Sequence, residues 1–65
     1  MRYEEIKNYE GKNVKLILTN TYRYKAFVKK VSESSVLIID KYNQSVTISL
    51  DNVALIMEDL ENGAR

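Results

Sequence analysis

The sequence predicts a mainly β protein, in which a short N-terminal helix precedes a five-stranded, strongly bent antiparallel small barrel. Val46, Ile48 and Leu50 alternate with polar residues, which is the pattern of a half-buried strand. Residues 53–57 are apolar at every position, which predicts a strand with neither face meant for water. Short apolar runs separated by polar turns, with no proline, complete the pattern of a bent meander.

The first element is predicted to be one short helix over residues 2–10. Tyr3, Ile6 and Tyr9 recur at helical spacing and form a narrow apolar stripe. Gly11 follows at the position where a left-handed conformation ends a helix at least cost. A helix this short is unstable alone, so we expect its stripe to pack across the sheet.

The first two strands are predicted at residues 13–19 and 22–31. Asn20 and Thr21 form the only polar break between them, which predicts a tight hairpin. In residues 29–31 the alternation of apolar and polar positions slips by one, which is typical of a β-bulge or a sharp bend.

The remaining strands are predicted at residues 35–40, 44–50 and 53–58. Asp51 and Asn52 form a hinge between the last two strands, and residues 58–65 read as an acidic tail. With no repeat or linker, we expect residues 1–65 to form a single domain.

A chain of 65 residues has a marginal hydrophobic core and usually needs further stabilisation. The absence of Cys excludes disulfides, and the absence of both Cys and His excludes thiolate and imidazole metal sites. We therefore expect no metal and no cofactor, and self-association is the remaining means of stabilisation.

Catalysis has little basis in this sequence. The usual general base and the strongest nucleophile are missing, and Gly11 and Gly63 are the only glycines, so there is no phosphate-binding loop. We expect a protein that is not an enzyme. No apolar run has the length of a membrane span, and the N-terminus lacks a signal-peptide core, so we expect no membrane partner and a cytoplasmic location.

The formal net charge of +1 hides an asymmetry along the chain. Residues 12–31 contain no Asp or Glu, whereas residues 58–61 are acidic. Three interpretations remain open: a polyanionic partner, complementary contacts between subunits, or solvated strand faces. The cations of the basic stretch are Lys12, Lys15, Arg23, Lys25, Lys29 and Lys30.

Aromatic residues interrupt this basic stretch, and the combination suits single-stranded nucleic acid, because cations neutralise phosphates and rings stack on bases. Tyr22 and Tyr42 lie at turn edges, whereas the parity of Tyr24 predicts a core position. The candidate RNA-binding residues are Arg23, Lys25, Lys29 and Lys30 for phosphate and Tyr22 and Tyr42 for stacking.

Self-association has the strongest support, because doubly apolar strands and open sheet edges are liabilities unless they are paired. The candidate subunit-interface residues lie in the last two strands and are Val46, Ile48, Leu50, Val53, Leu55, Ile56 and Met57.

The order of the elements and two segments resemble the Sm-like (LSm/Hfq-like) family. Residues 11–18 resemble the glycine-led first strand of the family's first motif, and residues 24–28 follow its aromatic-to-aliphatic pattern. The second motif is matched by Ile48, Asp51, Asn52, Val53 and Ile56. The resemblance covers about residues 3–57.

This resemblance implies a ring of about six or seven subunits, in which the fourth strand of one pairs with the fifth of the next. It also implies binding of uridine- or adenine-rich single-stranded RNA by a chaperone or processing scaffold. Asp51 occupies the aspartate position of the family's second motif, and we include it among the RNA-binding candidates for that reason.

The family's nucleobase pocket is degenerate in this chain. Ser32, Ser34 and Val36 stand at its loop positions, and Ser49 replaces its arginine, so a stacking platform and a cationic clamp are lost. The leading hypothesis is a homo-oligomeric ring that binds RNA through its basic and tyrosine surface. The alternatives are a ring that serves protein interaction or structure, and a monomeric subunit of a larger complex.

Overall fold

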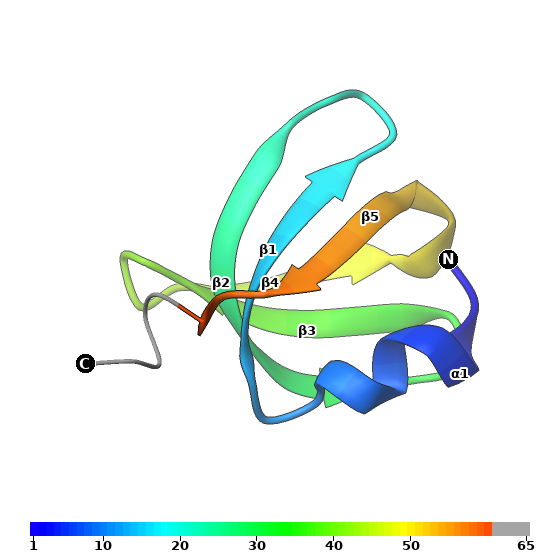
Figure 1. Ribbon diagram of the computed structural model, residues 1–65, viewed down its shortest axis with the longest axis horizontal. Coiled ribbons are helices and arrows are strands. Elements are labelled where there is room, and N and C mark those ends of the chain that lie inside the picture. Colours follow the sequence, from blue (N-terminus) through cyan, green and yellow to red (C-terminus); the bar gives the residue numbers. More distant parts are fainter. Residues whose placement is uncertain (61–65) are drawn as a thin grey trace.

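The computed structural model of the chain describes residues 1–60, in which a short helix precedes five antiparallel strands in one sheet (Figure 1). The strand order is β4-β3-β2-β1-β5. The predicted strands are confirmed to within a residue at each end, whereas the predicted helix is an α-helical turn followed by a 3-10 turn. The elements are α1 (Tyr3–Ile6), η1 (Lys7–Tyr9), β1 (Asn13–Leu18), β2 (Arg23–Val31), β3 (Ser35–Asp40), β4 (Ser45–Ser49), η2 (Leu50–Asn52) and β5 (Val53–Glu58).

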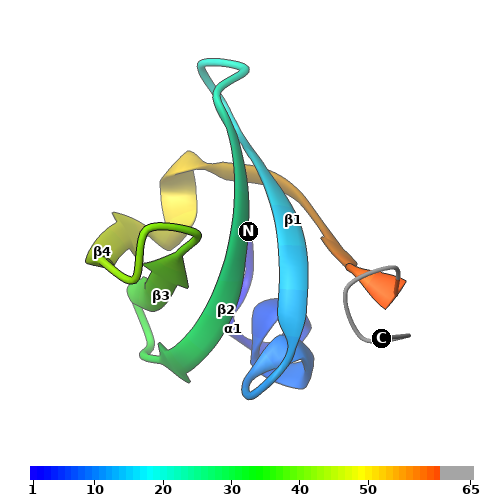
Figure 2. The same cartoon turned by 90° about the vertical axis from the view of Figure 1, so that its left-hand side faces the viewer.

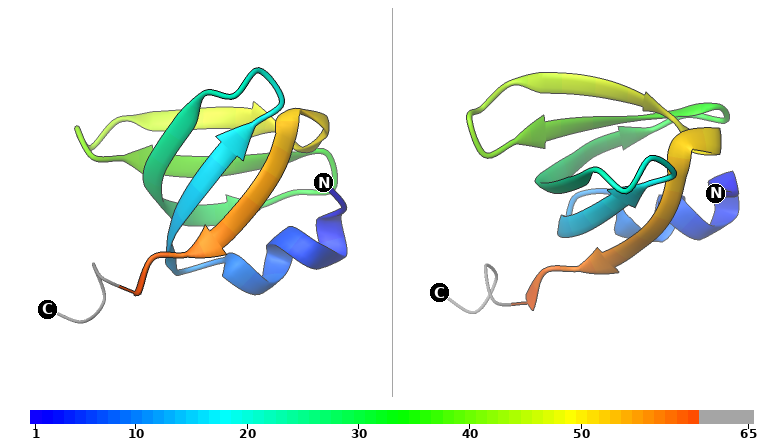
Figure 3. Two further views of the ribbon diagram at one scale, coloured as in Figure 1. Left: turned by 45° about the horizontal axis from the view of Figure 1, so that its top comes forward. Right: turned by 90° about the horizontal axis from the view of Figure 1, so that it is seen from above.

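The sheet is strongly bent but does not close, so the predicted barrel is wrong in this respect. β4 and β5 are the two outer strands, and within residues 1–60 they do not pair with each other. Figures 2 and 3 show β3 and β4 on one side and β1 and β5 on the other, with β2 curving between them. η2 crosses the opening and is fixed at both ends: the Leu50 N–H donates to the Ser34 carbonyl at 2.9 Å, and the Thr19 N–H to the Asn52 carbonyl at 2.8 Å.

The core fills the space between the two halves of the bent sheet, and the helix covers one end of it. Ile6 is fully buried, and Tyr3 and Tyr9 pack against the core from the same side, which confirms the predicted stripe. Gly11 ends the helical segment with φ of +81°, as predicted. The core consists of Ile6, Val14, Leu16, Ala26, Val28, Val31, Val36, Ile38, Ile48, Leu50, Val53 and Ile56.

The predicted hairpin between β1 and β2 is present and needs no glycine. Thr21 takes the left-handed conformation with φ of 69°, and its N–H donates to the Leu18 carbonyl at 2.9 Å. The side-chain oxygen of Asn20 accepts the Tyr22 N–H at 3.0 Å. An asparagine that binds the backbone two residues on is a common substitute for glycine in such turns.

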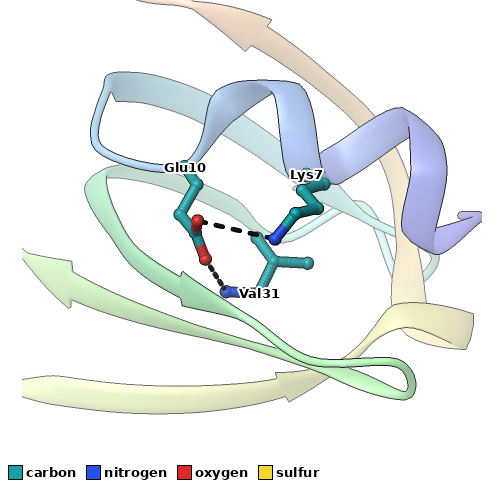
Figure 4. Close-up of polar contacts among 3 residues, drawn as sticks. All are labelled: Lys7, Glu10 and Val31. Carbon is teal, nitrogen blue, oxygen red and sulfur yellow. Dashed lines mark hydrogen bonds and ion pairs between the residues drawn. The ribbon is translucent and has the colours of Figure 1, made fainter.

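The predicted irregularity in β2 is a bulge, since its register against β3 shifts between Val28 and Lys30. Glu10 fixes the strand just beyond the bulge, because its Oε2 accepts the Val31 N–H at 2.8 Å (Figure 4). The other oxygen, Oε1, lies 3.8 Å from Lys7 Nζ. A hydrogen bond with Tyr3, and then the Glu10 charge, raise the pKa of Lys7 above its ordinary value of 10.5.

The chain itself covers only one face of β5, so the predicted strand with no face meant for water would need a second copy on its other face. Val53 and Ile56 are buried, but Leu55 and Met57 are 45% and 42% exposed on the other face.

No helix within residues 1–60 has the length and apolar character required to cross a membrane.

Candidate nucleic-acid interface and sheet edges

A groove lies where β2 extends past the end of β3. Residues 23–25 pair with β1 only, because pairing with β3 begins at Ala26 opposite Asp40. The corner between this free edge and the β3–β4 turn forms a groove of about 590 Å³. Its lining residues are Lys15, Leu16, Ile17, Tyr22, Arg23, Tyr24, Lys25, Asp40, Lys41, Tyr42 and Met57.

The groove combines aromatic rings from two segments far apart in the sequence. Tyr22 on the hairpin is 57% exposed, and its ring packs edge-on against Tyr24 with centroids 4.9 Å apart. Tyr42 on the β3–β4 turn is 72% exposed, and Lys41 Nζ lies 5.3 Å from the centre of its ring. Exposed rings beside cations can stack on a base while a neighbouring charge contacts its phosphate.

The β3–β4 turn is held in place by the single carboxylate of the groove. Asp40 Oδ1 accepts the N–H groups of Tyr42 and Gln44 at 2.9 and 3.0 Å, and Asn43 takes φ of 63°. The groove therefore has four cationic side chains against one carboxylate, a net charge of +3, and the carboxylate is engaged in shaping the turn. This arrangement favours an anionic ligand.

The predicted RNA-binding residues fall into three places. Arg23, Lys25, Tyr22 and Tyr42 meet in the groove. Lys29 and Lys30 lie outside it, exposed at the β2 bulge, and Asp51 lies elsewhere.

Asp51 lines a second hollow, of about 530 Å³, beside Glu4, Glu5 and Glu33. This hollow is lined by Glu33 and Ser34, just before the start of β3, whereas the groove is lined by Asp40 at the end of β3. Ser34 and Ser49, which occupy positions of the family's nucleobase pocket, line the same hollow. The structure therefore does not bring Asp51 together with the basic candidates, and the four carboxylates of this hollow outnumber the charges of Arg2 and the N-terminal amine, which disfavours phosphate.

Two cations and one tyrosine of the groove were missing from the predicted RNA-binding set. Lys15 lies directly opposite Lys25 across the β1–β2 pair, and the alternation of β1 already placed it on the outer face. Lys41 precedes Tyr42 in the sequence, and that adjacency was the available signal. Tyr24 was expected in the core and packs against it, but it also lines the groove.

The free edge of β4 presents unpaired backbone groups at alternate residues. The Asp40 N–H donates to the Gln44 carbonyl, and the Leu50 N–H donates to the Ser34 carbonyl, both at 2.9 Å. Hydrogen-bonded pairs alternate along an antiparallel ladder, so the backbone groups of Ser45, Thr47 and Ser49 point away from β3.

The free edge of β5 follows the same rule. The Asp59 N–H donates to the Asn13 carbonyl at 2.8 Å, which makes the pairs of Lys15 with Met57 and of Ile17 with Leu55 the hydrogen-bonded ones. The backbone groups of Ile56 and Glu58 therefore point away from β1. Within residues 1–60, each edge of the sheet can accept another strand.

Most of the predicted interface side chains belong to the core of their own chain. Ile48, Leu50, Val53 and Ile56 are buried, and Val46 packs against the core, so they can contribute to an interface only through their backbone. Leu55 and Met57 are the predicted interface residues whose side chains are exposed.

The fold and the groove define a small bent-sheet domain with a basic, tyrosine-lined surface and two open edges. Residues 1–60 contain no cluster of three or more side chains able to hold a metal ion. No protein-family model, no curated protein and no solved structure matches the chain.

Proposed function

We propose that this chain is an Sm-like, ring-forming protein that binds single-stranded RNA as an RNA chaperone or processing scaffold. The observation that carries the proposal is the groove, which combines a net charge of +3 with three tyrosines from two segments. The resemblance of residues 48–56 to the family's second motif supports the ring. The protein acts by binding and has no catalytic role.

The groove suits a single strand because its cations and rings recognise features that every nucleotide shares. Arg23, Lys25 and Lys41 neutralise phosphates, while Tyr22 and Tyr42 provide faces on which bases stack. Stacking tolerates any base, so we expect weak sequence selectivity. Charge neutralisation releases counterions, so we expect affinity to fall steeply with salt.

Ring formation uses the two open edges. β4 of one copy pairs with β5 of the next through the outward backbone groups of Thr47 and Ile56 and their neighbours. Contacts between two different edges are heterologous, and such contacts make rings when the rotation closes. A ring of about six or seven copies, as the resemblance implies, brings several grooves together, and each added groove raises avidity.

Fluorescence titration with uridine-rich and mixed oligonucleotides at about 50 and 200 mM salt tests the proposal. The three phosphate contacts of Arg23, Lys25 and Lys41 predict a salt slope near −2.1, because single strands give about −0.7 per neutralised phosphate, and the affinity then falls about 18-fold over this range. Tyr42→Ala should weaken binding further by about 1–3 kcal/mol. Tight, salt-insensitive uridine selectivity would contradict the proposal.

A ring that serves protein interaction is the second candidate. It is favoured by Leu55 and Met57, which are exposed beside the open β5 edge and lie opposite Ile17 and Lys15. Exposed apolar side chains next to a free edge are typical of an interaction surface. This candidate predicts that rings persist in solution but bind no oligonucleotide at low salt.

A further inference from the structure

The outer face of the sheet carries cations and no carboxylate within the described strands. The five strands contain only two acidic residues, Asp40 and Glu58. Asp40 lies opposite Ala26 and Glu58 opposite Val14, and both partners are buried on the inner face. Each acid therefore has the parity of the inner face.

These cations follow one strand. Arg23, Lys25, Phe27 and Lys29 occupy successive outward positions of β2, about 6.6 Å apart. Phe27 is 39% exposed in the middle of this row and lies opposite Ile39, which is only half-buried. An aromatic face between cations at this spacing repeats the composition of the groove.

The bulge extends this row at its far end. In a regular strand Lys30 would turn toward the core, but the register shift after Val28 leaves both Lys29 and Lys30 exposed. Val31 then returns to the core, and the Glu10 carboxylate holds its N–H at 2.8 Å. Two adjacent cations are thus fixed at the end of β2 remote from the groove.

We infer that a single strand bound in the groove continues along the outer face of β2, over Phe27, to Lys29 and Lys30. This inference rests on the proposed function and defines its ligand as a strand long enough to cover the whole of β2. From Tyr22 to Lys29 the contour is about 23 Å at ~3.3 Å per residue. That length corresponds to about seven nucleotides at the stacked spacing of ~3.4 Å.

Two oligouridines of different length test this path. One of about three nucleotides can fill only the groove, whereas one of about nine nucleotides can also cover the rest of β2. The double variant K29S/K30S should bind the short oligomer as the wild type does. For the long oligomer its salt slope should be smaller by about 1.4, because two phosphate contacts are lost. Phe27→Leu keeps apolar bulk and removes the aromatic face, and it should weaken binding of the long oligomer about tenfold.

Lys12→Ser is the matched control, because Lys12 belongs to the same basic stretch but lies 3.7 Å from Glu58. It should change the salt slope for neither oligomer, and circular dichroism should show that every variant is folded.

If K29S/K30S and Lys12→Ser behave alike while the wild type binds both oligomers, the path along β2 is refuted and the groove stands. If the wild type binds neither oligomer, the proposed function fails as well. Equal competition by a polyglutamate peptide of matched charge would also refute the path, because it would show that charge alone is recognised.

Discussion

Glu10 connects the helical segment to the strand that carries the basic row, and its removal gives a sharp prediction. Glu10→Ala deletes the acceptor of the Val31 N–H, which lies next to a buried side chain. This hydrogen bond is partly buried, and a donor left without a partner inside a protein costs about 1–3 kcal/mol. The lost ion pair with Lys7 adds little, because both side chains are substantially exposed and such pairs contribute less than about 1 kcal/mol.

We therefore expect Glu10→Ala to lower the free energy of unfolding by about 2 kcal/mol. For a domain of this size that corresponds to a fall in Tm of about 8–16 °C. Glu10→Gln keeps an oxygen acceptor at the same place and loses only the ion pair, so its cost should stay below about 1 kcal/mol. Glu33→Ala, an exposed acid in the β2–β3 turn, should be close to neutral.

Urea and thermal unfolding followed by circular dichroism measure these differences. The protein concentration must be held fixed, because association makes Tm concentration-dependent. If Glu10→Ala and Glu10→Gln are equally destabilising, the hydrogen bond to Val31 does not hold the bulge. In that case another feature must keep Lys29 and Lys30 exposed.

Two further predictions concern the helical segment. Gly11→Ala should cost about 1 kcal/mol in chemical denaturation, because φ is +81° while no atom lies within 4 Å of the added carbon, and Gly11→Asn should cost less. A neutral result for Gly11→Ala would contradict the left-handed conformation. The folded-state pKa of Lys7 is raised, chiefly by its hydrogen bond with Tyr3, so its contribution to stability is complete below pH 10.5 and is lost as the pH rises through the folded pKa. The stability difference between wild type and Lys7→Met should therefore shrink only above pH 10.5, and a difference that vanished at lower pH would refute this assignment.

Local pattern predicted the elements well because each of them depends on residues close in the sequence. The alternation of Val46, Ile48 and Leu50 placed their side chains inward, as the structure has them, and the slip after Val28 marked the bulge. Asn20 and Thr21 marked the hairpin for the same reason, since a turn is encoded by the residues that form it.

The sequence could not predict how far each strand extends past the end of its neighbour. The groove exists because β2 extends past β3, and this brings Tyr42 on one turn close to Tyr22 on another. Periodicity assigns a face to each residue but does not align the strand ends. The unbroken apolar run of β5 likewise did not show which side chains the chain leaves uncovered, and the structure shows them to be Leu55 and Met57 at the sheet edge.

The open sheet links the fold to the proposed assembly. A five-stranded sheet that does not close has two edges, and exposed edges favour pairing with another chain unless they are protected. Neither β4 nor β5 contains a proline, and no lysine lies in either strand. Of the usual features that protect an edge, proline and lysine are therefore absent from both strands, and β5 has only a register irregularity against β1 and the charge of Glu58.

The central claim is that copies of the chain assemble through their β4 and β5 edges. Its most direct test compares the mass of the assembly in solution for the wild type, Thr47→Pro and Thr47→Ala. The Thr47 N–H points away from β3, so a proline there removes an edge donor without removing a hydrogen bond within the chain. We expect multi-angle light scattering to give a ring for the wild type and Thr47→Ala, and a folded monomer for Thr47→Pro. A wild-type monomer, or a Thr47→Pro ring of unchanged mass, would contradict assembly through the β4 and β5 edges.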